Sequence, residues 1–108
     1  MKTILIDLDG VLNYYTGDYD ENYIPPILDG ASDFIKKTAQ NNIVKIFTTR
    51  NKLLTAKWLI ENKIDEYIDD VTNVKNPAWL IIDDRCLTFK GDFEKLYFEI
   101  QNFKPWYK

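Results

Sequence analysis

Residues 3–12 read TILIDLDGVL, and this stretch decides the fold. Its first four residues are apolar or β-branched, which is typical of a buried strand. The DLDG sequence at residues 7–10 ends that strand in a turn and places two carboxylates, those of Asp7 and Asp9, directly after it. The sequence therefore predicts a buried strand with acidic side chains at its carboxyl end.

Strands and helices are expected to alternate along the rest of the chain. Apolar runs predict further strands at residues 43–47, 67–71 and 78–82, and a short fifth strand at 87–89. Apolar residues at three- and four-residue spacing predict helices over residues 28–39, from the cap Asn51 to about 62, and over 93–103. Residues 12–26, which hold four tyrosines and a Pro-Pro pair, are expected to form a loop or hairpin. This order predicts an α/β fold: a Rossmann-like three-layer sandwich with a mostly parallel central sheet and helices on both faces.

Length and composition limit the function. The chain has 108 residues, which suits a single domain over residues 1–108 with no cap domain. Its net charge of −3 offers no basic footprint for nucleic acid. There is no histidine and only one cysteine, Cys86, which excludes Ser-His-Asp triads and the usual zinc sites. Without an export signal or an apolar run of about 18 residues, we expect a cytoplasmic protein with no membrane partner.

Polar, reactive residues follow three of the predicted strands, at residues 7–9, 48–50 and 83–85. Parallel strands place their carboxyl ends at one edge of the sheet, which is where open α/β sheets bind ligands, so the three clusters should converge. Each cluster alone has an ordinary explanation: an Asx turn in DLDG, a helix cap at Thr48 and Thr49, and a solvated acidic pair at Asp83 and Asp84.

Taken together, the clusters predict a metal and phosphate site. Two like charges ~4 Å apart repel by about 4 kcal/mol at an effective dielectric constant near 20, so several carboxylates at one edge require a cation or strongly raised pKa values. Only oxygen ligands are at hand, and the ion that fits them is Mg²⁺. With Lys75 and a hydroxyl at a helix N-terminus, the cluster would also bind a phosphate group.

In these residues the sequence resembles the haloacid dehalogenase-like superfamily of phosphohydrolases, in its small capless form. TILIDLDGVL resembles the first motif of that family, and IVKIFTTR resembles the second, an apolar strand that ends in Thr or Ser. Lys75 lies where the third motif places its lysine, and IIDD at residues 81–84 resembles the fourth motif. The four motifs occur in order and span most of the chain.

The resemblance implies a Mg²⁺-dependent phosphomonoester hydrolase acting on a phosphorylated metabolite, nucleotide or macromolecule end. Asp7 would be the nucleophile that forms an aspartyl-phosphate, and Asp9 would be the general acid and base. Thr48 would hydrogen-bond a phosphoryl oxygen, and Lys75 would offset negative charge. The implied metal ligands are Asp7, the backbone carbonyl of Asp9, and Asp84, with Asp83 beside them.

A capless site must select its substrate by other means. The flap, residues 12–26, leaves the sheet edge directly after Asp9, and its Tyr14 and Tyr15 are expected to contact substrate. Thr49 and Arg50 are further substrate-binding candidates. The aromatic tail at residues 103–107 is a second candidate lid, or the contact of a homodimer.

Two other classes share these residue types. A receiver domain of a response regulator also uses an aspartate, Mg²⁺, a Thr or Ser and a lysine, but its phosphoacceptor follows the third strand and its paired acids follow the first. The other alternative is a non-catalytic module that keeps the fold and the metal site.

Overall fold

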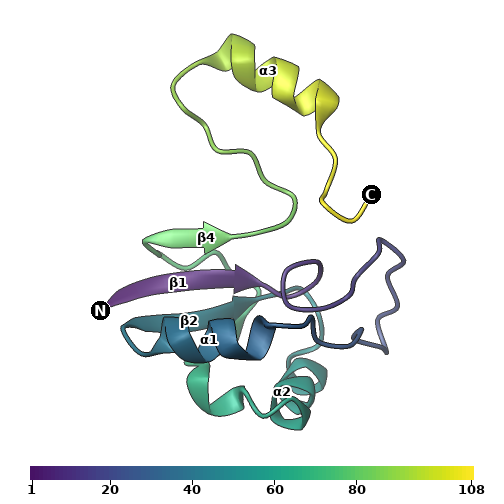
Figure 1. Cartoon of the computed structure of the whole chain (residues 1–108), viewed down its shortest axis with the longest axis vertical. Coiled ribbons are helices and arrows are strands. Elements are labelled where there is room, and N and C mark those ends of the chain that lie inside the picture. Colours follow the sequence, from purple (N-terminus) through teal and green to yellow (C-terminus); the bar gives the residue numbers. More distant parts are fainter.

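The computed structural model describes all 108 residues and has a four-stranded, all-parallel sheet in the order β3-β2-β1-β4. The strands are β1 (Lys2–Asp7), β2 (Asn42–Phe47), β3 (Asp70–Thr72) and β4 (Leu80–Ile82). The helices are α1 (Ala31–Ala39), α2 (Lys52–Glu61) and α3 (Phe93–Asn102), with a 3-10 turn η1 (Asp65–Tyr67) (Figure 1). The α/β class and the parallel sheet are confirmed.

The core lies between one face of the sheet and the helices α1 and α2. Alternate residues of β1 and β2 point into it, as the two-residue period of a strand requires. Helix α1 contributes Ile35 and helix α2 contributes Trp58 and Leu59 to the same cluster. The strand residues in this core are Ile4, Ile6, Val44 and Ile46, all at most 3% exposed. Each such apolar side chain stabilises the fold by roughly 1.5–3 kcal/mol on burial.

Local signals decide where the first two helices begin. Helix α2 begins where expected, because the side chain of Asn51 accepts a hydrogen bond of 3.0 Å from the backbone N–H of Leu54. Helix α1 begins at Ala31, three residues later than predicted. Gly30 precedes it with φ of 88°, a left-handed conformation that a right-handed helix cannot include. The backbone N–H of Leu28 instead donates to the carbonyl of Leu12, which closes the expected hairpin over residues 12–26.

The C-terminal third of the chain differs from the expected sandwich. Helix α3 forms at the predicted residues, but none of its residues is buried, and it lies apart from the sheet (Figure 1). The two helices in the core therefore cover one face of the sheet. The Cα radius of gyration, 14.7 Å, exceeds the value of about 13 Å for a compact chain of this length, which agrees with the detached helix.

The predicted fifth strand at residues 87–89 is wrong. These residues pair with no strand, because the chain leaves the sheet after β4 at a turn in which the side chain of Asp83 accepts from the N–H of Arg85. An irregular segment then leads to α3, whose apolar residues Phe93, Tyr97 and Phe98 are between 64% and 76% exposed. None of the helices combines the length and the apolar character needed to cross a membrane.

Candidate active site

Three carboxylates gather at the carboxyl edge of the sheet. Asp7 ends β1, and Asp83 and Asp84 directly follow β4. Because Ile6 is paired with Ile82 in the parallel register, the residues that follow them emerge side by side. One carboxylate oxygen from each of the three aspartates lies within 4.8 Å of the others. The structure thus brings together three of the four acidic residues that the sequence placed at this edge, and Asp9 is not in the group.

The crowding of negative charge changes the protonation of Asp7. Burial, a hydrogen bond with Asp84 and the charges of neighbouring aspartates raise the pKa of Asp7 from 3.8 to about 8. Burial also acts to raise the pKa of Asp84, but hydrogen bonds from Asp7 and from Tyr107 outweigh it, and the net direction is down. At neutral pH and without a cation, Asp7 therefore carries a proton that it shares with the ionised Asp84.

The cluster fits a hard divalent cation. Asp84 Oδ1 is buried and receives no hydrogen bond from an N–H or hydroxyl group, so only the proton of Asp7 or a cation can compensate this carboxylate oxygen. All the ligands that the cluster offers are oxygens, the donor type that Mg²⁺ prefers. A cation bound there would pair with the buried oxygen and take over the role of the shared proton.

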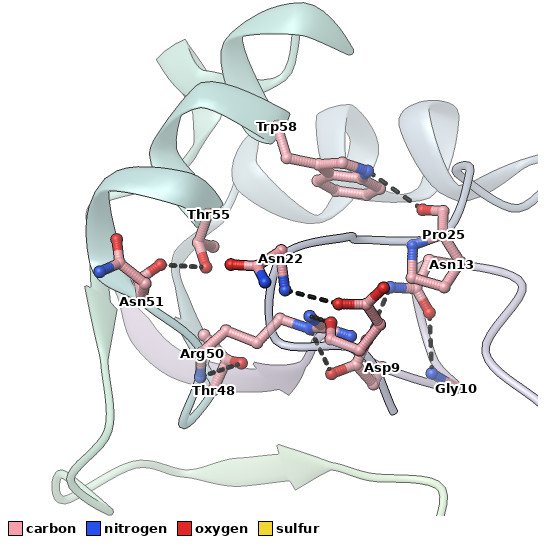
Figure 2. A network of polar contacts seen from close by, with 11 residues as sticks. Asp9, Gly10, Asn13, Asn22, Pro25, Thr48, Arg50, Asn51, Thr55 and Trp58 are labelled. Atoms are coloured by element: carbon pink, nitrogen blue, oxygen red, sulfur yellow. Dashed lines mark hydrogen bonds and ion pairs between the residues drawn. The ribbon is translucent and has the colours of Figure 1, made fainter. Parts of the chain in front are cut away.

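Asp9 is held in a polar network of its own, with Arg50 and Asn13 (Figure 2). Its carboxylate accepts a hydrogen bond of 2.8 Å from Arg50 Nε and one of 3.0 Å from Asn13 Nδ2. The Arg50 side chain is only 1% exposed, so this ion pair is largely shielded from water. Asn13 also accepts from the N–H of Gly10 at 3.1 Å, which fixes the turn after β1.

Arg50 also binds the flap. Its Nη1 donates to the backbone carbonyl of Asp20 at 2.9 Å, and its guanidinium lies 4.7 Å from the centre of the Tyr19 ring. Its Nη2 is buried and has no partner. Arg50 therefore connects the end of β2, the Asp9 carboxylate and the flap, and it keeps one donor free.

The other predicted site residues lie at the same edge with fewer contacts. Thr48 is buried, and its Oγ1 accepts from the N–H of Arg50 at 3.1 Å. Thr49 is exposed and lines a polar cavity of about 400 Å³ beyond β2 and β3. Lys75 is exposed and lines a cavity of about 330 Å³ together with Asp83. The three ion pairs of the structure join other residues, so Lys75 pairs with no site carboxylate.

The C-terminal tail reaches the site. Trp106 Nε1 donates to the carbonyl of Gly10 at 2.6 Å, and the hydroxyl of Tyr107 donates to Asp84 Oδ2 at 2.8 Å. The ring of Tyr15 meets the ring of Tyr107 edge-on, with centroids 5.8 Å apart, whereas Tyr14 is 47% exposed. Burial and the hydrogen bond to Asp84 raise the pKa of Tyr107 to about 12, so its hydroxyl remains a donor at neutral pH.

Gly10 is required by the close approach of these segments. Its φ is +82°, and a Cβ added there would overlap the carboxylate of Asp84 and lie 2.9 Å from Tyr107 Cε2. The glycine of the DLDG sequence therefore serves the contact between the tail, the flap and Asp84 as well as the turn itself.

Some contacts of the site have no signal in the sequence pattern. Asn13, which joins Asp9 to Gly10, follows the DLDG turn with nothing to mark it as a site residue. The sequence identifies the aromatic tail as a candidate lid, but it does not predict the hydrogen bonds from this tail to Gly10 and Asp84.

Without a divalent cation, we expect Asp7→Asn to raise the thermal midpoint at about pH 8 and to leave it nearly unchanged at about pH 4. The folded chain holds the Asp7 proton more tightly than the unfolded chain, so the wild type loses stability as the pH rises from about 4 to about 8. Asn carries no charge and still donates to Asp84. Partial exposure reduces the loss of unfolding free energy in the wild type. Even a loss of about 1 kcal/mol would separate the thermal midpoints of the two proteins by about 4–8 °C.

Differential scanning fluorimetry in EDTA at both pH values measures this difference. Equal midpoints for the two proteins at the higher pH would show that the Asp7 charge costs the fold nothing.

Comparisons with known proteins support the fold. No protein-family model and no curated protein match the chain. Among solved structures it is similar to a conserved protein from Bacteroides thetaiotaomicron, with a TM-score of 0.63 and 18% sequence identity over 94% of this chain and 90% of that one. At this identity the similarity shows a shared fold and carries no statement about activity.

Proposed function

We propose that the chain is a Mg²⁺-dependent phosphomonoester hydrolase that acts through an aspartyl-phosphate on Asp7, as its resemblance to the haloacid dehalogenase-like phosphohydrolases implies. The observation that carries the proposal is the cluster of Asp7, Asp83 and Asp84, whose carboxylate oxygens lie within 4.8 Å of one another at the ligand-binding edge of a parallel sheet. The buried, unpaired Asp84 Oδ1 supports a cation there.

In the proposed reaction, the ionised carboxylate of Asp7 attacks phosphorus and the bond from phosphorus to the ester oxygen breaks. The departing oxygen takes a proton from Asp9. Water then attacks the phosphorus of the aspartyl-phosphate and gives a proton to Asp9, while the bond from phosphorus to Asp7 breaks and inorganic phosphate leaves. Bound Mg²⁺ would supply positive charge that keeps Asp7 ionised and offsets the charge of the phosphoryl oxygens.

The Asp9–Arg50 ion pair bears on this scheme, because the carboxylate that would transfer the proton is held by the guanidinium. We propose that the phosphoryl group competes for Arg50, whose Nη2 has no partner, and so releases the Asp9 carboxylate toward the ester oxygen. Arg50 would then bind substrate, as would Thr48 and the exposed Thr49. Lys75 would act through its charge from the cavity that it shares with Asp83.

We also propose a substrate class and a cellular location for the protein. The substrate would be a phosphorylated small molecule or a phosphorylated macromolecule end, reached across the flap, where Tyr14 and Tyr15 offer aromatic faces. The cytoplasm is the proposed location, and the free, exposed thiol of Cys86 is compatible with it.

We expect phosphate release from p-nitrophenyl phosphate in the presence of Mg²⁺, its loss in EDTA, and its recovery when Mg²⁺ is added back. A colorimetric phosphate assay measures all three conditions. Full activity after exhaustive chelation would contradict the metal requirement. Metal binding without hydrolysis would favour the non-catalytic module, and a single stable phosphorylation without release would favour a signalling domain.

A further inference from the structure

The residues that follow α3, 103–108, return from this helix to the carboxyl edge of the sheet. The C-terminus lies beside the loop that follows β1 (Figure 1), and the hydrogen bond from Trp106 to Gly10 joins residues 96 positions apart. Lys108 lies against Gly17, and its N–H donates to the carbonyl of Pro105 at 3.1 Å, which turns the tail onto the flap. The tail is therefore fixed to the site by several residues.

The two oxygens of Asp84 have different surroundings. Oδ2 accepts the hydrogen bond of 2.8 Å from the Tyr107 hydroxyl, whereas Oδ1 is buried and no N–H or hydroxyl group donates to it. A carboxylate that is held at one oxygen cannot rotate freely about its Cβ–Cγ bond. The Tyr107 hydroxyl therefore decides which oxygen Asp84 leaves for another ligand.

Tyr107 is itself oriented by its neighbours. Its ring meets Tyr15 edge-on at 5.8 Å and the ring of Trp106 at 5.6 Å with an interplanar angle of 90°. The bond from Trp106 to Gly10 fixes the backbone next to it. The hydroxyl thus reaches Asp84 from a defined direction, at little further cost in side-chain entropy.

We propose that Tyr107 is a positioning residue for the metal centre: its hydroxyl holds Asp84 Oδ2 so that Oδ1 is presented to the cation, and Trp106 anchors the tail that carries it. The inference rests on the proposed metal site and adds a residue outside the four motifs. Hydrogen bonds to a metal-binding carboxylate typically account for about 10–100-fold in metal affinity.

The test measures Mn²⁺ affinity by the electron paramagnetic resonance signal of free Mn²⁺, in the full chain, without substrate. Tyr107→Phe keeps the ring against Tyr15 and removes only the hydroxyl, so we expect the dissociation constant to rise by about 10-fold or more. Trp106→Phe removes the donor to Gly10 and should weaken binding less. The matched control is Tyr97→Phe on α3, where the side chain is 64% exposed, and it should bind Mn²⁺ as the wild type does.

A second measurement separates positioning from damage. Turnover of p-nitrophenyl phosphate by Tyr107→Phe should approach the wild-type rate at saturating Mn²⁺, because the chemistry does not use the hydroxyl. Unchanged Mn²⁺ affinity in Tyr107→Phe, with normal binding by the wild type, would overturn the inference alone. Tighter binding would also overturn it, since the hydroxyl would then compete with the cation. A wild type that binds no Mn²⁺ would overturn the proposed metal site together with the inference.

Discussion

Asp7→Asn is expected to reduce the turnover of phosphomonoesters by at least about 10³-fold, because an amide cannot act as the attacking group that forms the covalent intermediate. The fold should remain intact. In the metal-free chain Asp7 is already neutral and donates to Asp84, and Asn reproduces both features. The loss should therefore be one of chemistry, with no loss of stability.

Steady-state release of p-nitrophenolate at saturating Mg²⁺ measures this loss. The matched control is Asp29→Asn, which removes an exposed carboxylate in the loop before α1 and should leave the rate unchanged. If Asp7→Asn kept more than a small fraction of the wild-type rate, another group would have to be the nucleophile.

The sheet and its order of elements could be predicted because they depend on local patterns. Apolar runs such as residues 3–6 are too short and too β-branched for helices, and the alternation of strands with helices requires parallel pairing. The boundaries of the helices are harder to predict where a single residue decides them. Because the backbone of Gly30 is left-handed, α1 begins three residues later than predicted. The spacing of the apolar residues over 28–39 does not reveal this boundary.

The position of α3 could not be predicted in the same way. The spacing of Phe93, Leu96, Tyr97 and Ile100 correctly predicts a helix with an apolar face. That pattern does not say which surface the face meets. In the structure the tail beyond α3 is bonded to Gly10 and Asp84, and the helix lies away from the sheet between this attachment and β4.

The convergence of the acidic residues could be predicted from topology alone, since parallel strands share one carboxyl edge. Individual contacts within the site could not. The pairing of Asp9 with Arg50 joins residues 41 positions apart, and the bond from Tyr107 to Asp84 joins residues 23 apart. Such contacts depend on side-chain directions that are set by packing, and no periodic pattern in the sequence encodes them.

Asp9→Asn is expected to reduce steady-state turnover by about 10²–10⁴-fold, the usual contribution of a general acid and base. Asp9 would act as a general acid when Asp7 attacks the substrate, and as a general base when water attacks the aspartyl-phosphate. The choice of leaving group can separate these two roles. A nitrophenolate leaves readily without a proton, so the first step should persist with p-nitrophenyl phosphate. An alkyl phosphate has a poor leaving group, and both of its steps should fail. Asn can still accept from Arg50 and Asn13, which keeps the ion-pair network close to its present geometry.

Stopped-flow absorbance should therefore show a burst of about one equivalent of nitrophenolate in Asp9→Asn, followed by slow release, because water attacks the aspartyl-phosphate without a base. Mass spectrometry of the quenched protein should find one phosphoryl group on the peptide that contains Asp7. Asp7→Asn should show neither the burst nor the phosphorylated peptide, which makes it the control for the covalent step.

A slow steady state in Asp9→Asn with no burst and no trapped phosphoryl group would contradict the assignment of Asp9 as the base for the second step. Removing one partner of a shielded ion pair can destabilise a fold, so the thermal midpoint of Asp9→Asn is measured alongside. A folded variant that accumulates the phosphorylated peptide would identify Asp9 as the group that acts after Asp7 has attacked.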